Sequence, residues 1–184
     1  MNPPTAINPN PKRFAPFLWL LLGLFLFRVT AHFLMIWTHG VSWLPPQQEW
    51  QSGAVKYEYL LIAQIAISTL FFKICIDFTK GSGFSVQPNR ILAYWLPAFG
   101  SIYLGVMLTR YVMRMTLYPP ERWTGGLIPI FFHCVLAIFI LIIALYHVRY
   151  FRPSLNTAFS KRMRISRLFI GALTTFFILA WIIH

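Results

Sequence analysis

Long apolar segments alternate with short polar segments along most of the chain. A helix needs about 20 apolar residues to cross about 30 Å of hydrocarbon. Helices are expected rather than strands, because an open strand edge in lipid leaves backbone groups without hydrogen bonds. The pattern therefore predicts an all-α integral membrane protein, a bundle of about five transmembrane helices. The predicted spans are Phe14–Thr38, Ala54–Ile76, Arg90–Met113, Leu127–Val148 and Ile165–Ile183.

The segment before the first span has a different composition. Prolines and polar residues dominate residues 1–13, which predicts a disordered N-terminal tail. Residues 14–184 then form a single transmembrane domain. Lys12 and Arg13, followed by an apolar run, also match the outline of a signal peptide. Because apolar residues continue to Trp37, we favour an uncleaved helix.

Composition and charge fit this picture. The 184 residues are 58% hydrophobic and only 11% charged, which is too little charge to cover the surface of a soluble domain of this length. The net charge of +12 would favour nucleic acid as a partner of a soluble protein. Here the basic residues flank apolar spans, so membrane topology and anionic lipid headgroups explain them, and no nucleic-acid partner is expected.

The distribution of lysine and arginine predicts the orientation, because cytoplasmic loops carry the excess of both. A cytoplasmic N-terminus and an outer C-terminus give the strongest bias, and a bacterial inner membrane is the expected location. The basic residues then inside are Lys12, Arg13, Lys73, Lys80, Arg90, Arg149, Arg152, Lys161, Arg162, Arg164 and Arg167. The charged residues then outside are Lys56, Arg110, Arg114, Arg122, Glu49, Glu58 and Glu121.

Two histidines are predicted at one depth in the outer half of the membrane. His32 lies six residues before the end of the first span and His133 six residues after the start of the fourth, so both are about 9 Å deep. Two imidazoles on different helices at one level suit axial ligation of a b-type haem, with Arg28 or Arg110 near the propionates. The alternative is that both histidines simply hydrogen-bond to neighbouring helices.

A third histidine, His147, follows His133 by fourteen residues, or about 21 Å along one helical face, as in di-haem cytochrome b helices. An inner haem would need a second histidine in the inner half, and the sequence has none there. His147 is therefore predicted to be an interfacial anchor. Gln64 and Ser68, one turn apart in the second span, are predicted to bond across to another helix.

Four charged residues make a second candidate site in the outer half. Glu58, Arg110 and Arg114 lie near the outer ends of their spans, and Arg28 lies one turn deeper than His32. Together they suit an anionic lipid headgroup or a quinone. Alternatively, Glu58 neutralises one arginine while the others extend to the headgroups.

These observations leave three hypotheses for function. No nucleophile with a base, metal motif or phosphate loop stands out in the sequence, so we expect a non-catalytic accessory or assembly subunit of a larger membrane complex. Its partners would be membrane lipids and other membrane-protein subunits. One alternative is a redox subunit that binds haem b or quinone through His32 and His133. The other is binding or processing of an anionic lipid at the outer leaflet.

Overall fold

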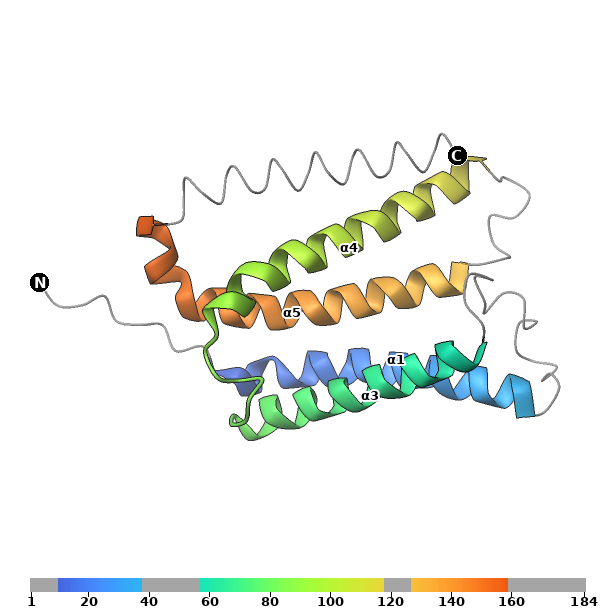
Figure 1. The fold of residues 1–184 in the computed structure, drawn as a ribbon, viewed down its shortest axis with the longest axis horizontal. Helices are drawn as coiled ribbons and strands as arrows, with labels where there is room; N and C mark the ends of the chain where they lie inside the picture. The colour runs from blue at the N-terminus through green and yellow to red at the C-terminus, as the bar shows by residue number, and fades with distance from the viewer. Residues whose placement is uncertain (1–9, 38–56, 118–126, 159–184) are drawn as a thin grey trace, which may run out of the picture.

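The computed structural model describes residues 10–37, 57–117 and 127–158 (Figure 1). These residues form helices and turns, and no strand occurs among them. The elements are a short 3-10 helix, η1 (Pro11–Arg13), and the α-helices α1 (Ala15–Trp37), α3 (Tyr57–Lys80), α4 (Arg90–Leu117) and α5 (Leu127–Ala158).

Four helices, α1, α3, α4 and α5, are long and apolar enough to cross a membrane. The all-helical prediction and four of the predicted spans are thus confirmed, as expected of an integral membrane protein. The helices α3, α4 and α5 extend beyond the C-terminal ends of the predicted spans, because polar residues at those ends continue the helix. The fifth predicted span, Ile165–Ile183, lies outside the described residues, and the predicted orientation stays a prediction.

Local capping sets two of the helix ends. The Asn89 side-chain oxygen accepts hydrogen bonds from the backbone N–H of Ile91 and Leu92, at 2.9 and 3.3 Å, and so caps the start of α4. At the end of α3, Gly81 adopts a positive φ of 76° and its N–H bonds to the Asp77 carbonyl at 2.9 Å. A left-handed glycine is a common helix terminator, because it lacks a Cβ.

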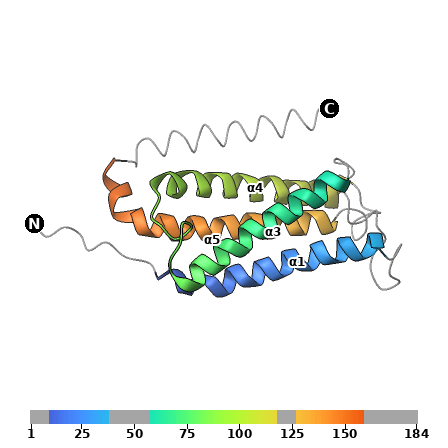
Figure 2. The same cartoon turned by 60° about the horizontal axis from the view of Figure 1, so that its bottom comes forward.

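The helix α5 occupies the centre of the arrangement (Figures 1 and 2). The helices α1 and α3 pack side by side on one side of it, and α4 packs along the other. Gly100 permits the close approach of α4, since a Cβ at this position would lie 2.8 Å from Leu141 Cδ2 of α5. Small residues at helix interfaces have this role in membranes, where van der Waals packing drives association.

We call the two ends of this bundle the η1 end and the distal end. The η1 end holds η1, the start of α1, the end of α3, the connecting loop of residues 81–89 and the start of α4. The distal end holds the opposite ends of these helices and the start of α5. In the predicted orientation, the η1 end faces the cytoplasm.

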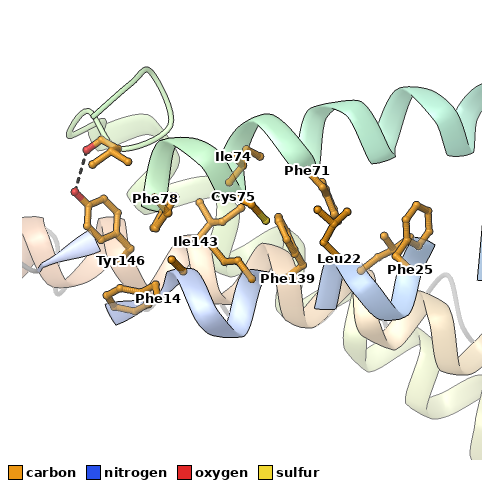
Figure 3. Packing of buried hydrophobic residues seen from close by; sticks show 14 residues of the cluster. Phe14, Leu22, Phe25, Phe71, Ile74, Cys75, Phe78, Phe139, Ile143 and Tyr146 are labelled. Atoms are coloured by element: carbon orange, nitrogen blue, oxygen red, sulfur yellow. Dashed lines mark hydrogen bonds between the residues drawn. The ribbon is translucent and has the colours of Figure 1, made fainter. Parts of the chain in front are cut away.

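The main apolar core begins at the η1 end and extends along the helices to the middle of the bundle (Figure 3). Phe71 of α3 stacks on Phe139 of α5, with ring centroids 3.8 Å apart. Phe14 contacts Tyr146 edge to face, with ring centroids 5.7 Å apart. The buried members of the core come from α1, α3, α5 and their flanking residues: Phe14, Ala15, Leu18, Leu22, Phe25, Phe71, Ile74, Cys75, Phe78, Val86, Leu136, Phe139, Ile143 and Tyr146.

The described part of the chain begins before the predicted first span. Asn10 caps η1 through a 3.0 Å bond from the Lys12 N–H to its side chain, and η1 packs against α3. Residues 11–13, which the sequence places in a disordered tail, are therefore helical in the structure. Pro11 fits the first turn of this helix, because the backbone N–H that proline lacks would have no partner within the helix there.

Candidate functional site

The distal half of α1 carries two buried polar side chains. Arg28 and His32 lie one turn apart, and their side chains are 6% and 1% exposed. Polar and ionisable side chains are costly in hydrocarbon, so in transmembrane helices they usually face the protein interior. The sequence placed both residues on one face of the helix, and the structure turns that face toward the other helices.

His32 pairs with a residue of α3. Its Nδ1 lies 3.4 Å from the Gln64 amide nitrogen, and the Gln64 side chain is 4% exposed. This confirms the predicted cross-helix bond of Gln64. Ser68 differs from its prediction, because its hydroxyl donates to the Gln64 carbonyl of its own helix at 2.7 Å. A serine in a helix can donate its hydroxyl hydrogen to the backbone carbonyl four residues earlier. Its position in the sequence therefore does not reveal a partner on another helix.

His133 pairs with a residue of α4. Its Nδ1 lies 2.6 Å from the Tyr103 hydroxyl oxygen, and both side chains are half-buried. Either group donates in this bond, depending on which imidazole nitrogen carries the proton. The bond leaves Nε2 of His133 as the ring atom that a further partner can reach. Tyr103 was not predicted as a partner from the sequence, because a tyrosine in an aromatic-rich span does not stand out from its neighbours.

Arg28 joins these two pairs. Its guanidinium carbon lies 5.2 Å from the centroid of the Phe132 ring, which is within the range of a cation–π contact. It also acts electrostatically on His32, His133 and Tyr103. The structure therefore brings Arg28, His32 and His133 into one polar cluster, together with Gln64 and Tyr103. We call these five residues the distal cluster.

The other predicted site residues lie at different distances from this cluster. Arg110 of α4 acts electrostatically on His133 and is half-buried. Arg114 lies one turn further along α4, toward the end of the helix. Glu58 belongs to the first turn of α3, and its side chain lies outside the described residues. The structure thus places Arg110 near His133.

A second cluster of polar side chains lies at the η1 end and was not predicted from the sequence. Asp77 of α3 is 2% exposed and forms an ion pair with Lys73. Its Oδ2 also accepts hydrogen bonds from the hydroxyl and the N–H of Ser85, at 3.0 and 3.3 Å. Gly83, with φ 126°, packs directly against this carboxylate. These bonds fold the loop back onto the end of α3, which is a structural role.

His147 corrects the sequence interpretation. It is 0% exposed and therefore buried, not an interfacial anchor. It lies near the Ser85 backbone, and neither ring nitrogen forms a hydrogen bond of normal geometry with the residues that the structure describes. The neighbouring Tyr146 donates its hydroxyl to the Val86 carbonyl at 2.9 Å (Figure 3). His147 lies at the η1 end of the bundle, where the loop of residues 81–89 covers it, and the sequence pattern does not predict that cover.

Comparison with known proteins adds no functional information. The chain matches no protein-family model, and the searches found no match to a curated protein or to a solved structure. Within the described residues, no group of three or more histidine, cysteine, aspartate or glutamate side chains could hold a metal ion. The chemistry of the distal cluster is therefore the basis for a functional proposal.

Proposed function

We propose that the distal cluster binds the ring headgroup of a lipid-soluble quinone. The observation that supports this most directly is the meeting of two hydrogen-bonded pairs, His32 with Gln64 and His133 with Tyr103, beside Arg28. Four helices contribute these side chains. A polar cluster of this kind within a membrane span is costly, and it marks a functional site more often than a stabilising one.

The side chains match the chemistry of a quinone. A quinone presents two carbonyl oxygens, which accept hydrogen bonds and become anionic or protonated on reduction. Imidazole and guanidinium groups donate to such oxygens, and imidazole also exchanges protons near neutral pH. A mostly apolar lining with a few placed polar groups is the usual composition of a small-molecule site. Phe132, under the Arg28 guanidinium, belongs to such a lining.

Depth favours a quinone over a phosphate headgroup. Arg28 lies nine residues before the last residue of α1, so it is about 13 Å from that helix end. His133 lies six residues after the start of α5, or about 9 Å from it. A phosphate stays in the hydrated headgroup zone, because moving its charge into hydrocarbon is costly. A neutral quinone ring on an apolar tail reaches this depth without that cost.

One observation favours haem b as a second candidate. His133 bonds to Tyr103 through Nδ1, so its Nε2 is the atom that iron would bind, and His32 on the facing helix would supply the second imidazole. Histidine ligands of metals usually engage their other ring nitrogen in this way. The 1% exposure of His32 favours the quinone, since a planar macrocycle needs more open space beside its ligand. A role as an accessory subunit stays a prediction and is compatible with either ligand.

The test is to analyse what copurifies with the full chain in mild detergent. We expect an extractable quinone in near-stoichiometric amount and no Soret absorption. His133→Gln should lose most of the quinone, because the side chain that pairs with Tyr103 is altered. His147→Gln is the matched control, since this buried histidine lies about 21 Å away along the same helix and should leave the quinone content unchanged.

Other outcomes are equally informative. A Soret band that disappears in His133→Gln would replace quinone by haem. Equal quinone content in wild type and His133→Gln, or no quinone even after reconstitution in quinone-containing vesicles, would overturn the proposal.

A further inference from the structure

Basic side chains from three chain segments gather at the η1 end of the bundle. The 3-10 helix η1 folds against α3, and Lys12 Cε comes within 3.4 Å of the position that a Cβ on Gly81 would take. Lys12 therefore lies beside the end of α3, where Lys80 is exposed. Arg149 of α5 reaches the same place, with its guanidinium carbon 5.9 Å from the Phe14 ring centroid. With the exposed Arg13, these residues form what we call the basic collar: Lys12, Arg13, Lys80 and Arg149.

The positive charge of the collar is not neutralised by the nearest acid. Asp77 lies three residues before Lys80, but its carboxylate is 2% exposed and is engaged by Lys73 and Ser85. Lys12, Lys80 and Arg149 form no ion pair with any residue that the structure describes. The collar thus presents several cations to the outside, with the only described carboxylate turned inward.

An exposed aromatic side chain lies in the loop next to these cations. Phe84, in the loop of residues 81–89, is 60% exposed, although the following Ser85 and Val86 are buried. An apolar ring beside basic residues at the end of a transmembrane bundle suits the boundary between headgroups and acyl chains. Its exposure shows that the described parts of the chain do not cover this ring.

We infer that the basic collar binds the phosphate headgroup of an anionic phospholipid in the leaflet at the η1 end. Cations from η1, α3 and α5 surround the headgroup, and Phe84 enters the acyl region beside it. Basic groups at the cytoplasmic ends of transmembrane helices recognise anionic headgroups in this way. The inference is independent of the distal cluster, which lies at the opposite end of the helices.

A lipid-binding titration of the full chain in detergent tests the inference. The probes are short-chain fluorescent phosphatidylglycerol and phosphatidylcholine. We expect the wild type to prefer phosphatidylglycerol by at least about tenfold. Each lysine or arginine near an anionic surface contributes about fivefold. K12Q and R149Q should each lower phosphatidylglycerol binding by about that factor and leave phosphatidylcholine binding unchanged.

Arg90→Gln is the matched control, because it removes one charge from the same end of the bundle but from outside the collar. It should retain phosphatidylglycerol binding. The exposed collar substitutions should also leave the thermal unfolding midpoint unchanged. An equal loss in R90Q and K12Q would show attraction by net charge alone and would overturn the site. Displacement of the lipid by an equal concentration of inorganic phosphate would overturn the lipid as its ligand. Neither outcome depends on whether a quinone binds at the distal cluster.

Discussion

The two ends of the bundle use the same helices but fill the space between them differently. At the η1 end, stacked and edge-to-face aromatic rings pack between α1, α3 and α5, as with Phe71 on Phe139. At the distal end, α1 and α5 meet through Arg28 and Phe132, and His32 and His133 each bond to a polar partner on a different helix. Between the helices, stacked aromatic rings predominate toward the η1 end, where the buried polar groups hold the loop, and hydrogen bonds from one helix to another predominate toward the distal end.

This difference separates stability from function. In lipid, helices gain no hydrophobic driving force by associating, so close packing such as that of the aromatic core stabilises their association. The polar contacts of the distal end are worth about 0.6 kcal/mol each on average. Substitutions at the η1 end should therefore affect folding, and substitutions at the distal end should affect ligand content. Three paired substitutions test this division.

The largest effect is expected for Phe139→Ala in the η1 core. Phe139 is 0% exposed and stacks on Phe71, so its removal leaves a cavity and breaks a ring contact. We expect a loss of about 3 kcal/mol in the free energy of unfolding. Unfolding in detergent, followed by tryptophan fluorescence, measures it. Phe131→Ala is the control, because Phe131 of the same helix is 52% exposed; an equal loss in both variants would contradict the assigned core.

An intermediate effect is expected for Gly83→Ala in the loop at the η1 end. Gly83 has φ 126°, and an added Cβ would overlap the Asp77 carboxyl carbon. The strained backbone costs about 2 kcal/mol, and displacement of the carboxylate weakens the bonds to Ser85. Thermal unfolding should show the loss. Gly23→Ala should be neutral, because a Cβ there meets nothing within 4 Å. A neutral Gly83→Ala would show that the loop does not depend on this contact.

The smallest effect on stability compares two tyrosine hydroxyls at opposite ends. Tyr103→Phe removes the bond to His133, and Tyr146→Phe removes the bond to the Val86 carbonyl. Each should cost about 0.6 kcal/mol in the free energy of unfolding. Only Tyr103→Phe should change the amount of copurifying quinone, as measured in the lipid extract. If Tyr146→Phe lowered the quinone content as much, the proposed division between the ends would fail.

Part of the candidate site could be predicted from helix geometry. Arg28 and His32 lie four residues apart, so any α-helix places them on one face. His32 and His133 lie in the same half of the bundle, as the loop positions and the helical rise predict. Helical geometry does not fix the rotation of one helix against another. Gln64 and Tyr103 could therefore not be identified as the partners of the two histidines.

The loop at the η1 end was the least predictable feature. Asp77 reads in the sequence as an ordinary polar residue near a helix end, and His147 as one near the interface. Each is buried because Gly81 and Gly83 turn the chain back over the end of α3 and bring Ser85 to the Asp77 carboxylate. A long-range fold of this kind depends on contacts between residues distant in the sequence, such as Tyr146 with Val86.

The sequence by itself determined the helical class, the limits of four apolar helices to within about ten residues, and the position of each polar side chain along its helix. These follow from hydrophobic length and from the fixed rise of a helix, which are local properties. Only the tertiary structure decided which faces meet: the pairing of His133 with Tyr103, the burial of His147 and the gathering of Lys12 with Arg149. The reason is that packing and hydrogen bonding between helices depend on the rotation of each helix about its axis and on the angle at which two helices cross. The sequence of a single segment fixes neither.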